Sequence, residues 1–81
     1  MTIKKALDVA TEIFRDVFDD ESITISESTT AKDIEDWDSL EHINLVLALE
    51  DRFNLKFTMD EVVGMENVGD MINIVMERGE L

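Results

Sequence analysis

Apolar residues in this chain recur at intervals of three and four, which is the repeat of a helix that buries one face. The clearest run begins near the start of the chain: Ile3, Ala6, Leu7, Ala10, Ile13, Phe14, Val17 and Phe18. No segment convincingly indicates a β-strand. We therefore predict an all-α protein whose first helix spans residues 3–18.

The helical repeat is lost between residues 19 and 38, where Asp, Glu, Ser and Thr dominate. Three apolar residues within this segment can hold it against the core: Ile23, Ile25 and Ile34. We predict a long ordered loop rather than a helix.

The repeat resumes after Asp38, which is a good N-cap for a second helix over residues 39–53. Glu41 stands at the third helical position, where its side chain can complete a box-like cap. Asn54 can end this helix, because asparagine tolerates the left-handed conformation common at helix C-termini.

Two shorter helices follow. Thr58 and Glu61 have the spacing of a capping box and predict a third helix over residues 59–64. Asn67 can cap a fourth helix that closes near Gly79. We therefore predict one domain, residues 1–81, built as a four-helix bundle with three longer helices and one short helix.

The predicted second helix has more apolar residues than one face can hold. One stripe comprises Leu45, Val46, Leu49 and Phe53. A second stripe, rotated away from the first, comprises Leu40, Ile43 and Leu47, and is bordered by Glu41, Asn44, Glu50 and Asp51. Either the helix is buried on two sides, or the second stripe is a docking surface framed by polar and acidic residues.

The charge of the chain narrows its possible partners. With 20 acidic and 7 basic residues among 81, the formal net charge is −13, which argues against binding nucleic acid or anionic lipid. Basic protein partners are the natural inference, although an acidic surface also serves solubility alone. Cysteine is absent, which is compatible with the cytoplasm, and no apolar run approaches membrane-spanning length. We expect a cytoplasmic protein.

Ser39 is the residue at which chemistry is most plausible. As the first helical residue it places a hydroxyl at the positive end of a helix, a favourable position for a phosphate ester. Serine at a helix start is also ordinary capping chemistry. His42, the only histidine, lies one turn along the same helix and is expected to be a partly buried core residue, so no catalytic triad can be assembled.

Neither the acidic clusters nor the methionines indicate a further site. The acidic clusters around residues 16–21 and 33–38 lack the ligand spacing and central glycine of a calcium loop, so we predict no metal site. Four methionines are expected to fill gaps in the core: Met59, Met65, Met71 and Met76.

The stretch from Asp36 to Phe57, DWDSLEHINLVLALEDRFNLKF, resembles the acyl carrier protein family, with Asp38-Ser39-Leu40 as its most specific part. The resemblance implies a carrier that is not an enzyme. It implies that a phosphopantetheinyl transferase attaches 4′-phosphopantetheine from coenzyme A to Ser39, with Asp38 in support. The thiol of the arm would hold acyl intermediates as thioesters, in fatty-acid or related acyl-chain biosynthesis.

In this family the second helix recognises partners. The resemblance therefore assigns contacts with acyl-loading, acyl-modifying and acyl-transferring enzymes to Leu40, Glu41, Ile43, Asn44, Leu47, Glu50 and Asp51. The acidic members of this set would steer basic patches toward the apolar ones, in contacts that are weak and sensitive to salt. We expect a monomer that does not insert stably into membranes.

Three positions depart from the pattern of many fatty-acid carriers. Trp37 stands where a small residue is common, Asn44 where an acid is common, and Thr58-Met59 where the third helix often begins with proline. These differences argue against the housekeeping fatty-acid carrier and leave room for a specialised carrier of a modified acyl, polyketide, aminoacyl or peptidyl group. An aminoacyl, peptidyl or D-alanyl carrier is an alternative, and an unmodified acidic helical interaction module is an alternative of another class.

Overall fold

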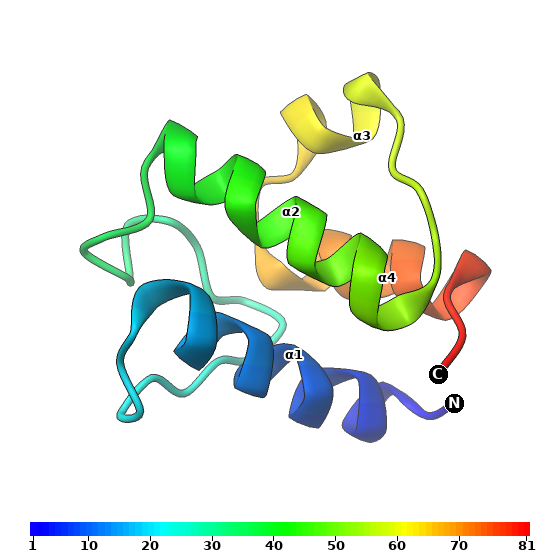
Figure 1. The fold of residues 1–81 in the computed structure, drawn as a ribbon, viewed down its shortest axis with the longest axis horizontal. Coiled ribbons are helices and arrows are strands. Elements are labelled where there is room, and N and C mark those ends of the chain that lie inside the picture. The colour runs from blue at the N-terminus through cyan, green and yellow to red at the C-terminus, as the bar shows by residue number, and fades with distance from the viewer.

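The computed structural model describes residues 1–81 and contains four helices and no strands. They are α1 (Ile3–Phe18), α2 (Ser39–Phe53), α3 (Met59–Gly64) and α4 (Val68–Arg78). Helix α1 packs against both α2 and α4, while α3 lies on the side of α2 away from α1 (Figure 1). The predicted all-α class and the predicted helices are confirmed.

The apolar face of α1 forms one wall of the core. Ala6, Ala10 and Phe14 are fully buried, and Ile13 and Phe18 are nearly so. The first residue of the predicted face, Ile3, is instead exposed, because it occupies the open first turn of the helix. The opposite wall of the core comes from Leu45, Leu49 and Phe53 of α2 and from Val68, Met71, Ile72 and Val75 of α4.

The loop between α1 and α2 is held by side chains, as expected. Ile23 is buried, and Ile25 and Ile34 are half-buried against the core. Trp37 is a further anchor that the apolar pattern did not single out: its indole meets the Phe14 ring edge-on, with the ring centroids 5.3 Å apart. Since Trp37 lies two residues before Ser39, this contact fixes the chain at the entrance to α2.

The caps of α2 are partly as predicted. The Asp38 carboxylate accepts a hydrogen bond from the backbone N–H of Glu41 at 2.9 Å, and Asn54 ends the helix with a φ of 54°. The expected reciprocal bond from the side chain of Glu41 is not formed. Its carboxylate accepts instead from Asn44 Nδ2 at 2.8 Å, and the Asp38 N–H donates to the Asp36 carbonyl.

Helix α3 is held by polar contacts, because none of its residues is buried. The predicted capping box between Thr58 and Glu61 is present. The guanidinium of Arg78, at the end of α4, donates two hydrogen bonds to Glu61, of 2.6 and 2.8 Å, and one to the Lys56 carbonyl. The bonds from Arg78 and from the Thr58 N–H lower the pKa of Glu61 to about 2.

None of the four helices has the length and apolar character needed to cross a membrane.

Candidate functional site

Ser39 is exposed and is the first residue of α2, where the sequence analysis places it. The N–H of Glu41 is capped by the Asp38 carboxylate, and the N–H of His42 donates to the Asp38 carbonyl. The backbone amides of Ser39 and Leu40 make no backbone hydrogen bond. An oxyanion attached to the serine would therefore meet two free donors and the positive end of the helix dipole.

The two apolar stripes of α2 have different environments. Leu45, Val46, Leu49 and Phe53 are buried. Leu40, Ile43 and Leu47, which continue from Ser39 along the helix, are exposed to 69, 47 and 57%. The second stripe therefore faces solvent, and the alternative of a helix buried on two sides is wrong.

The polar residues beside this stripe are not equivalent. Asp51 and Asn44 are exposed, and Asn44 donates to the half-buried Glu41. The Glu50 carboxylate accepts a 2.7 Å hydrogen bond from the backbone N–H of Phe57. Glu50 is thus partly engaged in fixing the chain between α2 and α3, a structural role that sequence reasoning missed because the two residues belong to different segments.

Helix α3 extends the exposed apolar surface. Met59 is 74% exposed and Val63 is 77% exposed. The expectation that Met59 fills a gap in the core is wrong, because α3 is held by its caps and by Arg78 rather than by burial. Met71 is buried, and Met65 and Met76 are half-buried against the core, as expected. Capping residues predict where α3 starts but not which of its sides meets the bundle.

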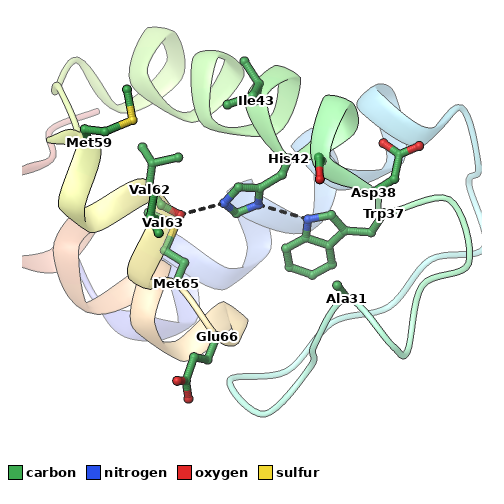
Figure 2. Close-up of a pocket in the computed structure, with 11 residues that line it drawn as sticks. Ala31, Trp37, Asp38, His42, Ile43, Met59, Val62, Val63, Met65 and Glu66 are labelled. Atoms are coloured by element: carbon green, nitrogen blue, oxygen red, sulfur yellow. Dashed lines mark hydrogen bonds between the residues drawn. The ribbon is translucent and has the colours of Figure 1, made fainter.

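A pocket of about 460 Å³ lies between α2 and α3, directly beside Ser39. Its lining is mainly apolar and is formed by Ala31, Trp37, Asp38, Ser39, His42, Ile43, Met59, Val62, Val63, Met65 and Glu66 (Figure 2). The serine predicted from the sequence as the attachment site therefore borders a space suited to an apolar group.

His42 occupies the centre of this pocket wall (Figure 2). The indole Nε1–H of Trp37 donates to His42 Nδ1 at 3.1 Å, and His42 Nε2 lies 3.0 Å from the carbonyl oxygen of Val62. A ring nitrogen that accepts from an indole N–H carries no proton, so the neutral imidazole must donate from Nε2 to Val62. Both ring nitrogens are engaged, and His42 is not available as a base for Ser39.

The described side chains offer no other reactive constellation. No group of three or more His, Asp or Glu side chains is arranged to hold a metal ion. Every buried side-chain nitrogen and oxygen has a hydrogen-bond partner. What the geometry supports is an accessible hydroxyl at a helix start, an apolar pocket next to it, and an exposed apolar strip along α2 and α3.

Comparisons with known proteins agree with this arrangement. Residues 8–75 match the family described as "Phosphopantetheine attachment site". A search of curated proteins found no match. Among solved structures, the chain is similar to the solution NMR structure of holo acyl carrier protein from Geobacter metallireducens, with 46% sequence identity and a TM-score of 0.84. The similarity covers 89% of this chain and 83% of that one.

The family match and the 46% sequence identity to a solved carrier protein together decide the class of the protein. The four-helix arrangement is that of the solved carrier, and the matched family is defined by covalent attachment of phosphopantetheine. The protein is accordingly a carrier modified by a phosphopantetheinyl transferase, and it works with acyl-handling enzymes rather than being an enzyme itself. The chain belongs to the acyl carrier protein family.

Proposed function

We propose that Ser39 is the attachment site of 4′-phosphopantetheine and that residues 1–81 form one monomeric carrier domain. The observation that carries the proposal is the exposed hydroxyl of Ser39 at the first position of α2, within the Asp38-Ser39-Leu40 tripeptide of the matched region. Ser39 is also the only serine that lines the apolar pocket.

The surroundings of Ser39 fit a phosphodiester. The unpaired amides of Ser39 and Leu40 can donate to its oxygens, and the helix dipole stabilises its negative charge. The Asp38 carboxylate is turned to the N–H of Glu41, so its supporting role is to hold the helix start in shape. Once attached, the arm supplies a thiol that carries the acyl group as a thioester.

The pocket supports an acyl cargo. Its apolar members include Trp37, Ile43, Met59 and Val62, and its only charged lining residues are Asp38 and Glu66. A cationic aminoacyl group would gain from the two carboxylates but would lose its hydration against the apolar lining, whereas an alkyl chain gains from burial. We place the protein in fatty-acid or related acyl-chain biosynthesis in the cytoplasm, as a specialised carrier.

The exposed strip of α2 is the proposed recognition surface. Leu40, Ile43 and Leu47 supply apolar contacts, while Glu41 and Asp51 attract basic patches on the transferase and on acyl-loading and acyl-transferring enzymes. Asn44 and Glu50 border the same strip. Exposed acidic side chains steer a partner mainly during its approach, so these contacts are weak and salt-dependent.

Intact-mass spectrometry after incubation with coenzyme A and a broad-specificity phosphopantetheinyl transferase tests the attachment. The wild type should gain one phosphopantetheine, and Ser39→Ala should gain none. Ser28→Ala is the matched control, because Ser28 is an exposed serine outside the pocket, and it should be modified like the wild type. Modification of Ser39→Ala, or none of the wild type by several active transferases, would refute the proposal.

A further inference from the structure

A hydrogen-bonded bridge formed by three segments lines the pocket beside Ser39. Trp37 comes from the loop before α2, His42 from α2, and Val62 from α3 (Figure 2). None of the fully buried core residues, such as Phe14, Leu45 and Met71, lines the pocket. Trp37 both lines the pocket and packs on the buried ring of Phe14, so the bridge lies where the pocket meets the core.

We infer that His42 is a specificity-determining residue: its bridge bounds the pocket on the side of the core and limits the length of the acyl chain that can be buried there. The inference rests on the proposed attachment to Ser39. It concerns a residue to which sequence reasoning assigned no role.

The bridge resists displacement by an alkyl chain because its members are polar and partly buried. Separating His42 from Trp37 and Val62 leaves an indole N–H, a carbonyl and two ring nitrogens without partners, and an alkyl chain offers neither a donor nor an acceptor. Trp37 cannot simply swing away, since its indole is packed on Phe14 and also lies 6.4 Å from the ring of Phe18, measured between centroids.

This geometry predicts how cargo length affects protection of the thioester. Each methylene that enters the pocket favours the buried state until the chain reaches the bridge. Further methylenes stay in water and add no protection. In the wild type, protection should therefore rise with chain length until the chain reaches the bridge, and then stop rising.

The test uses holo-protein loaded with saturated acyl thioesters in a series from acetyl to hexadecanoyl, and measures the rate of cleavage by hydroxylamine. Intact mass first verifies the modification of Ser39, so that a failure of the proposed attachment is seen separately. In the wild type, the cleavage rate should fall with chain length and then become constant once the chain reaches the bridge. In His42→Leu, which removes both hydrogen bonds, hexadecanoyl cleavage should be slowed at least about fourfold relative to the wild type, the effect of one newly buried methylene, with acetyl cleavage unchanged.

Two further variants separate the bridge from general effects on packing. His42→Gln keeps a donor for the Val62 carbonyl, so its cleavage rates should stay close to those of the wild type. Trp37→Phe removes the indole N–H but keeps an aromatic ring, so its cleavage rates should shift toward those of His42→Leu. A purely structural role would change the rates for all chain lengths alike. The inference is overturned if the ratio of the hexadecanoyl to the acetyl cleavage rate in His42→Leu equals that ratio in the wild type. If His42→Leu does not fold, the same ratio in Trp37→Phe decides.

Discussion

Leu47 and Leu49 lie two residues apart on α2 but face opposite environments, and substituting each in turn tests the assignment of the two stripes. Leu47 is 57% exposed, whereas Leu49 is 0% exposed. Leu49→Ala removes buried methyl groups and leaves a cavity in the core, which costs about 3 kcal/mol of unfolding free energy. For a domain of this size, that loss lowers the Tm by roughly 12–24 °C. Leu47→Ala should change the unfolding free energy by less than about 0.5 kcal/mol.

The effects of the two variants on modification of Ser39 should be the reverse of their effects on stability. Leu47→Ala should slow modification of Ser39 by the transferase about fivefold or more at limiting carrier concentration, the loss of about 1 kcal/mol that defines an interface anchor. Leu49→Ala, measured at a temperature where it is folded, should be modified at nearly the wild-type rate. Urea and thermal denaturation followed by circular dichroism give the stabilities, and mass spectrometry gives the rates. If Leu47→Ala destabilises the protein as much as Leu49→Ala does, the second stripe is not a free surface.

Three further predictions follow from the contacts described above. Folding lowers the pKa of Glu61 from 4.5 to about 2, so its carboxylate stabilises the folded state above about pH 4.5 and loses this effect as the pH falls toward 2. The difference in unfolding free energy between the wild type and Glu61→Gln, measured by urea titration, should therefore shrink over this pH range. A constant difference would contradict the role of the Arg78 contact. Asp38→Ala should cost about 1 kcal/mol through loss of the N-cap, whereas Asp38→Asn should keep most of the stability, and equal losses would argue against capping. Glu41→Lys with Asp51→Lys should slow modification at low salt and lose this effect at high salt, with Asp8→Lys on exposed α1 as the control; slowing that persists at high salt would point to direct contacts rather than steering.

The starts of α2, α3 and α4 could be predicted from sequence because capping is local. The side chains of Asp38, Thr58 and Asn67 each accept a hydrogen bond from the backbone N–H three residues ahead. The capping residue and its partner therefore lie within one helical turn of each other. The place of Ser39 follows from the same reasoning. The predicted capping bond from the Glu41 side chain is equally local, but it is not formed, because Asn44 of the same helix donates to the Glu41 carboxylate instead.

Contacts between segments could not be predicted in this way. The period of α2 reveals two stripes, but only the placement of α1 and α4 decides which stripe is buried. The bond from His42 to Val62 spans 20 residues, and its partner is a backbone carbonyl, which no side-chain pattern marks. The exposure of Met59 likewise depends on how a short helix is held from outside by Arg78.

The way α3 is attached has a consequence for the motions of the molecule. Since α3 contributes no buried side chain, its detachment would break a few hydrogen bonds while leaving the packing among α1, α2 and α4 intact. The free energy of such a local opening is therefore well below that of global unfolding, and the amide protons of α3 should exchange with solvent through a separate, subglobal event. The wall of the pocket formed by α3 can thus open to admit the cargo and then close again on the bond between Val62 and His42, while the rest of the fold stays closed.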